Sequence, residues 1–67
     1  MQGVVKFFNP GREFGFIKIH PDLADVFFDA QDVIGEPVSW GDIVEYWLAD
    51  DPRGRGLVAI EVQRLLE

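Results

Sequence analysis

The stretch REFGFI, residues 12–17, places two phenylalanines around a glycine, shortly after a Pro-Gly pair. Successive side chains of a β-strand point to opposite faces, so Phe14 and Phe16 share one face while Gly15 and Ile17 share the other. Aliphatic residues are typical of a core face, which leaves the two rings on the opposite face. The stretch therefore predicts a strand with a packed inner face and an aromatic outer face.

Strand signals recur along the chain as runs of β-branched and aromatic residues between turn residues. The runs are VVKFF (4–8), FGFIKI (14–19), DVFFDA (25–30), IVEYWLA (43–49) and LVAIEVQRLL (57–66). QDVIGEPVSWGD, between the third and fourth runs, shows no sustained period and predicts a helical turn followed by a loop. Because closure protects strand edges in so short a chain, we expect an all-β fold, a five-stranded antiparallel barrel with a short helical turn between strands three and four.

Alternation assigns an inner and an outer face to these runs. The inner face comprises Val5, Ile17, Ile19, Val26, Phe28, Val44, Leu48 and alternate residues of the last run. Phe14, Phe16 and Phe27 fall on the outer face of adjacent strands. Exposed apolar patches usually have a use, and stacking of a base on a ring is worth about 1–3 kcal/mol. The patch suits unstacked bases, but two other interpretations stay open: the rings pack under the acidic central loop, or the patch binds a protein.

Charge is distributed unevenly along the sequence. Six basic and twelve acidic residues give a net charge of −6, which argues against strong non-specific attraction to polyphosphate. Residues 1–18 carry +2, residues 19–51 carry −9 with no Lys or Arg, and residues 52–67 carry +1. If the fold brings the two ends together beside REFGFI, a small positive surface forms there. Charge alone favours the simpler interpretation that sparse charges keep a small domain soluble.

Length and composition set the outer limits. With 67 residues and no internal linker, we expect a single domain spanning residues 1–67. The chain has no cysteine, hence no disulfide and no thiol nucleophile. No apolar run approaches the roughly 20 residues of a membrane span, and the first residues lack the order of a signal peptide. These features predict a soluble cytoplasmic protein with no membrane contact.

Catalytic and metal chemistry find little support in the sequence. His20, the one histidine, lies in a His-Pro-Asp turn, where a solvated side chain is more typical than a ligand or a general base. The acids Asp22, Asp25, Asp29 and Asp32 recur every three or four residues, but they lack EF-hand order and fit a solvated acidic rim better. With no paired nucleophile and base, we expect no enzyme, no metal and no cofactor.

Four motifs, in order and spacing, resemble the cold-shock domain family over essentially the whole chain. They are GVVKFFN (3–9), REFGFI, DVFFDA and GLVAIEV (56–62). The resemblance implies a monomeric OB-fold barrel that binds single-stranded RNA or DNA with low sequence specificity, acts like an RNA chaperone and has no catalytic activity. It implies as nucleic-acid-binding residues Lys6, Phe7, Phe8, Arg12, Phe14, Phe16, Asp25, Phe27 and Arg55.

Individual roles follow from the same resemblance. Lys6 matches a lysine that contacts the nucleic-acid backbone, and Phe7 takes the place of a stacking tryptophan. Asp25 matches an aspartate that can hydrogen-bond a base, and Arg55 matches an arginine of the last loop. Simple alternation puts Phe7 on the face opposite Lys6, so the first strand must bend at a point that the sequence does not reveal.

The chain also departs from the family pattern. Glu13 replaces a glycine, Asp29 replaces a histidine and Ala30 replaces a phenylalanine. The loop before Trp40 is shorter than usual, and Trp40 is the candidate substitute for its aromatic residue, whereas Trp47 is expected to cover an edge. We therefore expect weak, tolerant binding of short pyrimidine-rich strands. The alternative is a barrel of this type that has diverged to protein binding or regulation.

Overall fold

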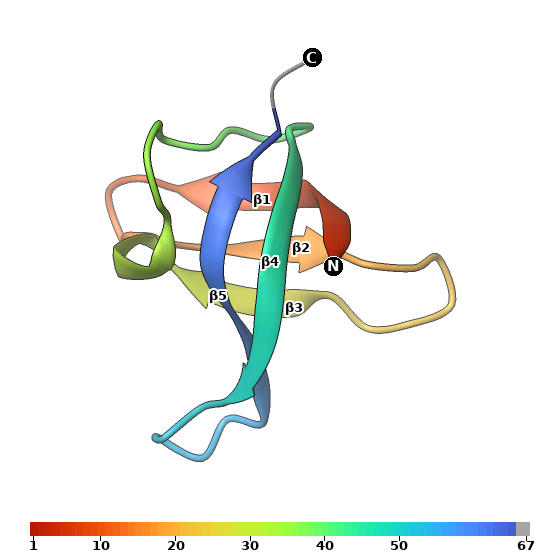
Figure 1. Cartoon of the computed structure of the whole chain (residues 1–67). Coiled ribbons are helices and arrows are strands. Elements are labelled where there is room, and N and C mark those ends of the chain that lie inside the picture. The colour runs from red at the N-terminus through yellow and green to blue at the C-terminus, as the bar shows by residue number, and fades with distance from the viewer. Residues whose placement is uncertain (66–67) are drawn as a thin grey trace.

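A computed structural model describes residues 1–65 and contains five strands and one short helix within that range. The elements are β1 (Gln2–Asn9), β2 (Phe14–Lys18), β3 (Val26–Asp29), the 3-10 helix η1 (Ala30–Asp32), β4 (Ile43–Asp50) and β5 (Leu57–Arg64). The strands close into a barrel in the order β1-β2-β3-β5-β4 (Figure 1). The predicted five-stranded OB-type barrel, with its helical turn between β3 and β4, is confirmed. The fifth run ends as a strand at Arg64, and Leu66 lies outside the described residues.

One strand pairing differs from the antiparallel barrel that we expected. β3 and β5 run parallel, with Phe27 opposite Val58 and Phe28 opposite Ala59, while the other four pairings are antiparallel. An odd number of strands cannot alternate in direction around a closed ring, so at least one pairing must be parallel. A parallel pair needs a long crossover, which the segment containing η1 and β4 provides. The sheet is therefore mixed.

The barrel interior is built from the residues that alternation assigned to it. Of the predicted core, Val5, Ile17, Val26, Phe28 and Val44 are buried, and Ile19 and Leu48 are half-buried against them. Tyr46 joins this core from β4 with 1% of its surface exposed. The Tyr46 hydroxyl has no hydrogen-bond partner within the described residues, and burial raises the pKa of this side chain.

Two glycines of β1 and β2 face inward where the chain leaves no room for a side chain. A Cβ at Gly15 would lie 2.4 Å from the Phe7 carbonyl oxygen and 2.7 Å from the Phe28 ring. A Cβ at Gly3 would lie 2.5 Å from a methyl group of Ile17. The buried Phe28 ring therefore packs directly against the backbone of Gly15, the glycine between the two rings of REFGFI.

A β-bulge in β1 supplies the bend that the sequence required. Val5 pairs with Ile17 and Phe7 pairs with Phe16, which leaves Lys6 as an extra residue in β1. One extra residue reverses the alternation of the strand beyond it. Phe7 consequently joins the outer face, and the next residue, Phe8, turns toward the core.

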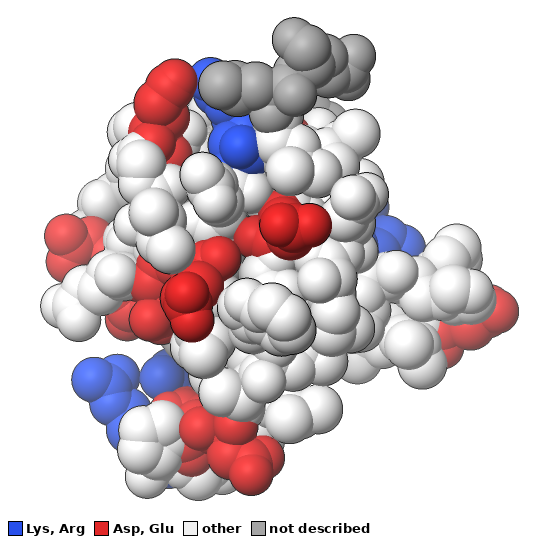
Figure 2. All heavy atoms as spheres, viewed as in Figure 1, with Lys and Arg blue, Asp and Glu red and all other residues white. Residues whose placement is uncertain are grey.

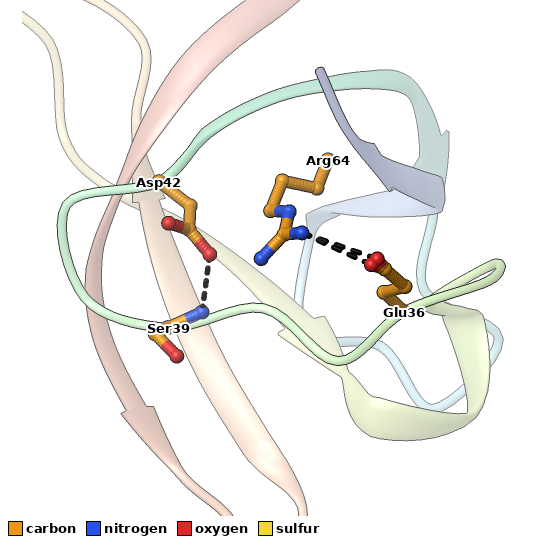
Figure 3. A network of polar contacts seen from close by, with 4 residues as sticks. All are labelled: Glu36, Ser39, Asp42 and Arg64. Carbon is orange, nitrogen blue, oxygen red and sulfur yellow. Dashed lines mark hydrogen bonds and ion pairs between the residues drawn. The ribbon is translucent and has the colours of Figure 1, made fainter. Parts of the chain in front are cut away.

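The long connection between β3 and β4 is tied to the end of β5. Arg64 Nη2 donates hydrogen bonds to both carboxylate oxygens of Glu36, at 3.0 and 3.2 Å (Figure 3). In the same region the Ser39 backbone N–H donates to Asp42 Oδ2 at 2.8 Å. Arg64 is thus engaged with this connection and does not contribute to a positive surface beside REFGFI.

Candidate nucleic-acid interface

Four phenylalanines of three neighbouring strands form a continuous group on the outside of the barrel. The distances between the centroids of contacting rings run from 5.7 to 6.4 Å. The rings belong to Phe7 on β1, Phe14 and Phe16 on β2, and Phe27 on β3, and we call them the aromatic surface. Phe7 is 44% exposed, and the other three are half-buried outside the core cluster. The predicted outward orientation of the β2 and β3 rings is confirmed.

Strand register explains how these rings meet. Phe16 pairs across the sheet with Phe7 on one side and with Phe27 on the other. Aromatic cross-strand pairs stabilise a sheet by roughly 0.2–1 kcal/mol each. Without the bulge at Lys6, Phe7 would point into the barrel, and Phe16 would have an aromatic cross-strand partner only on β3.

Phe8 lies on the opposite side of the sheet from the aromatic surface. Its ring stacks on the buried Phe28 ring, at 5.8 Å between centroids and 5° between planes. Phe8 also lines a hollow of about 300 Å³ together with Trp40, which is 75% exposed. The ring of Phe8 thus lies at this hollow and not in the row of four rings, and its role in binding stays a prediction.

The predicted cations differ in how far they are already engaged. Lys6 and Arg12 are exposed and form no ion pair within residues 1–65. Lys18 Nζ lies 3.8 Å from Asp25 Oδ1, with both side chains 35% exposed. Asp25, the predicted base contact, thus lies just before β3 and beside a cation.

Arg55 sits directly on the aromatic surface. Its guanidinium carbon lies 4.3 Å from the centroid of the Phe27 ring, and its Nε donates to Asp51 Oδ2. The hydrogen bond from the Arg53 backbone N–H and the one from Arg55 lower the pKa of Asp51, so this carboxylate is charged at neutral pH. The charge of Arg55, in the loop before β5, is therefore already neutralised by Asp51.

Acidic residues that depart from the family pattern have local structural roles. Asp29 Oδ1 accepts a hydrogen bond from the Gln31 backbone N–H at 2.9 Å and caps η1. Glu13 has φ 62°, and its carbonyl accepts the Ala30 N–H at 2.8 Å. Desolvation, and secondarily the charge of Asp29, raise the pKa of Asp32. This cap was not predicted from the sequence, although an aspartate before a helical turn is its usual signal.

The outer face of the β4–β5 hairpin has a different character. Trp47 is 63% exposed there, and Glu45 and Glu61 beside it are exposed as well. Figure 2 shows this side of the molecule, where acidic groups outnumber basic ones. Trp47 is thus largely open to solvent, and its expected role in covering an edge stays a prediction.

Other chemistry has little support within residues 1–65. The His20 side chain is 57% exposed, and its Nδ1 accepts a hydrogen bond from the Asp22 backbone N–H at 3.1 Å, as expected for a solvated loop histidine. The described residues contain no group of three or more His, Cys, Asp or Glu side chains that could hold a metal ion. Across the same residues, no helix has the length and apolar character needed to cross a membrane.

Comparisons with known proteins agree with this architecture. The solved structure of drosophila Unr CSD456 superimposes with a TM-score of 0.77 at 24% sequence identity. The match covers 97% of this chain and 26% of that one, so the chain spans about a quarter of that structure's length. No curated protein matches the sequence. The family profile described as 'Cold-shock' DNA-binding domain matches residues 1–65, and the chain belongs to this family.

Proposed function

We propose that the aromatic surface binds single-stranded RNA or DNA, with bases stacked on its rings and phosphates held by Lys6 and Arg12. Family membership makes the chain a single-stranded nucleic-acid-binding module, and the proposal concerns where and how it binds. The observation that carries it is the row of rings in mutual contact, 5.7–6.4 Å apart, beside two cations that have no ion pair in the described chain.

Stacking explains why we expect low sequence specificity. Every base has a π-face, so each stacked base contributes about 1–3 kcal/mol whatever its identity. Pyrimidine runs stack weakly on themselves and are therefore the ligands that we expect to bind best. Because the protein binds only unpaired strands, it would shift weak RNA structures toward the open form, as an RNA chaperone does. All four rings come from one chain, so a monomer suffices.

Several features reduce the expected affinity. Lys18, Arg55 and Arg64 are already paired with carboxylates. Asp29 and Ala30 occupy two positions where the family has rings, and each missing platform costs about 1 kcal/mol or more. Two such losses correspond to a weakening of about 30-fold or more. We therefore propose a weak binder, without catalysis, in keeping with a family of binding domains.

The test is a titration of a short fluorescein-labelled oligo-dT strand, followed by fluorescence anisotropy at two salt concentrations. With two phosphate contacts, log affinity should fall with log salt at a slope near −1.4, and with three near −2.1. Phe16→Ala should lose most of the binding, because its ring is at the centre of the row. Absence of binding at low salt, or binding that ignores salt, would contradict the proposal.

Protein binding stays as the second candidate, and one observation favours it. Trp47 is 63% exposed on a different face from the aromatic surface, two residues from the exposed Glu45 and paired with Ile60, which precedes the exposed Glu61. An aromatic ring with carboxylates around it suits Lys or Arg side chains of a basic partner. If this were the main function, a basic peptide would bind with a dependence on Trp47 while the labelled strand would not bind.

A further inference from the structure

The Phe27 ring differs from the other three because the chain itself covers it. The Arg55 guanidinium carbon lies 4.3 Å from the ring centroid, a cation–π contact. The Phe14 ring stacks against the same residue, with 5.7 Å between centroids and 18° between planes. A base can therefore stack on Phe27 only if Arg55 moves away. If Arg55 stays, the base contacts the Arg55 side chain instead of the ring.

Asp51 holds Arg55 in this position. The Asp51 side chain is 5% exposed, its Oδ2 accepts the Arg55 Nε–H, and its Oδ1 accepts the Arg53 backbone N–H at 3.0 Å. The Asp51 backbone is bonded too, because its N–H donates to the Gly56 carbonyl at 2.7 Å and its carbonyl accepts from Gly54 at 2.9 Å. The aspartate that holds the arginine is therefore itself fixed in the loop by its side-chain and backbone hydrogen bonds.

Displacement of Arg55 by a base is unfavourable for this reason. If the guanidinium left, the nearly buried Asp51 carboxylate would keep only the hydrogen bond from Arg53, and a buried charge without its partner is costly. The cation–π contact with Phe27 would also be lost. The exchange would gain one stacking contact and lose two interactions, so Arg55 should stay in place when a strand binds.

The part of Arg55 that faces solvent can take over the stacking role. Its side chain is 45% exposed, and a guanidinium is a flat group on which nucleic-acid bases stack. Beside it lies a groove of about 380 Å³, lined among others by Phe27, Arg55 and Asp29. A base entering this groove meets a planar guanidinium whose carbon lies 4.3 Å from the centroid of an aromatic ring.

We propose that a base stacks on the Arg55 guanidinium instead of on Phe27, and that Asp51 is the positioning residue that holds this guanidinium over the ring. This inference rests on the proposed function and deepens it. It assigns Arg55 a stacking role rather than a contact with a phosphate, which arginines at nucleic-acid interfaces often make. It also extends the site by one residue, Asp51, for which the resemblance implied no role.

Stacking depends on the planar shape of the Arg55 side chain, whereas a phosphate contact depends on its charge. Because Asp51 already neutralises Arg55, removal of the arginine should leave the salt dependence of binding unchanged. A phosphate contact would instead make the slope of log affinity against log salt shallower by about 0.7. Arg55→Lys keeps the charge and removes the planar group, so it distinguishes the two roles directly.

The experiment measures binding of the fluorescein-labelled oligo-dT strand to the whole chain and to four variants, at several salt concentrations. Arg55→Ala and Arg55→Lys should both weaken binding by about tenfold, with an unchanged salt slope. Asp51→Asn retains an acceptor for the Arg53 N–H but loses the ion pair, and it should weaken binding by about threefold. In the Arg55→Ala background, Asp51→Asn should have no further effect, because it acts through the arginine.

Three results would overturn the inference while the proposed function stands. Tighter binding by Asp51→Asn would mean that Arg55 is a cover that must leave. Wild-type affinity in Arg55→Lys, or a shallower slope in Arg55→Ala, would mean that Arg55 acts as a charge. Thermal unfolding of each variant separates loss of fold from loss of contact, and the two Arg55 variants test the inference even if Asp51→Asn unfolds. A wild-type protein that binds no strand would overturn the proposed function and this inference together.

Discussion

The outer faces of β1–β3 and of the β4–β5 hairpin both expose aromatic rings, but the charged residues near those rings differ. On β1–β3 four rings touch one another, and Lys6 and Arg12 lie in the same strand pair and its turn. On the hairpin the exposed residues near Trp47 in the strand register are the glutamates Glu45 and Glu61. An exposed ring alone therefore does not define a surface for nucleic acid, because phosphates approach cations and are repelled by carboxylates.

A bulge lies behind both faces, and the residue at the bulge carries opposite charge in the two cases. In β1 the extra residue is Lys6, and the shift that it causes brings Phe7 outward. In β5 two residues, Glu61 and Val62, lie opposite Tyr46 alone, and Glu61 adopts φ 50°. The same backbone device thus places a cation beside one aromatic face and an anion beside the other.

The largest expected effect lies beneath the aromatic surface. Gly15→Ala would place a Cβ 2.4 Å from the Phe7 carbonyl oxygen, so the two strands that carry three of the four rings must separate. We expect a loss of about 3 kcal/mol in the free energy of unfolding, measured by urea denaturation. Gly11→Ala, whose Cβ would meet only a side-chain oxygen at 3.3 Å, is the matched control and should cost far less. Equal losses in both variants would contradict the assigned role of Gly15.

Binding should distinguish the two most comparable rings. Phe7 is 44% and Trp47 63% exposed, so neither substitution removes much of the core. Phe7→Ala should weaken binding of the labelled oligo-dT strand by about tenfold, since one stacking platform is lost, whereas Trp47→Ala should leave affinity unchanged. A larger loss for Trp47→Ala would place the strand on the hairpin face and break the comparison.

The interior layer under the hairpin contains a buried hydroxyl, that of Tyr46, with no hydrogen-bond partner among residues 1–65. Tyr46→Phe removes the hydroxyl and should raise the free energy of unfolding by about 1 kcal/mol, because its desolvation is no longer uncompensated. The pKa of Tyr46 is raised above 10.0, so the wild type should lose stability as the pH rises through this range, and the variant should not. Destabilisation by Tyr46→Phe at neutral pH would mean that the hydroxyl is satisfied.

Two glutamates with positive φ sharpen the comparison further. Glu13→Gly and Glu61→Gly each replace a residue in the left-handed region, at 62° and 50°, and each should stabilise the fold by about 0.5–1 kcal/mol. Only Glu13→Gly should also tighten binding of the oligo-dT strand, by about twofold, because it removes a carboxylate near the bound nucleic acid. Glu13→Gln, which removes the charge but keeps the strain, should tighten binding without the gain in stability. An equal gain in affinity from Glu61→Gly would contradict the separation of the faces.

The smallest effect is a pH dependence near η1. The raised pKa of Asp32 means that the folded protein binds its proton more tightly than the unfolded chain does, whose pKa is near 3.8. Stability that is present below this value is lost as the pH rises through the folded pKa. Asp32→Asn should therefore be more stable than the wild type above that window and equal to it below. Asp22→Asn, an acid with 89% of its side chain exposed, is the control, and an identical profile for both variants would contradict the assignment.

Alternation and turn residues were enough to predict the five strands, most of the core and the outward rings of β2 and β3. These features depend on a period of two residues, which is visible along a single strand. The family resemblance added Lys6, Phe7 and Arg55, and the structure places Lys6 and Phe7 at the bulge and Arg55 on Phe27. It did not separate Phe8 from the row of rings, because the bulge that does so appears only in the pairing with β2.

The amino-acid sequence by itself determined which residues can be inside and which rings can be outside, since that choice is local. Only the tertiary structure decided the parallel pairing of β3 with β5, the position of the bulge at Lys6 and the contact of Arg55 with Phe27 and Asp51. Each of these depends on partners distant in sequence or on loop geometry: closure of an odd number of strands, the register against a neighbouring strand, and a loop folded onto a ring. Such choices are made when separate segments meet, and the pattern of a single strand does not contain them.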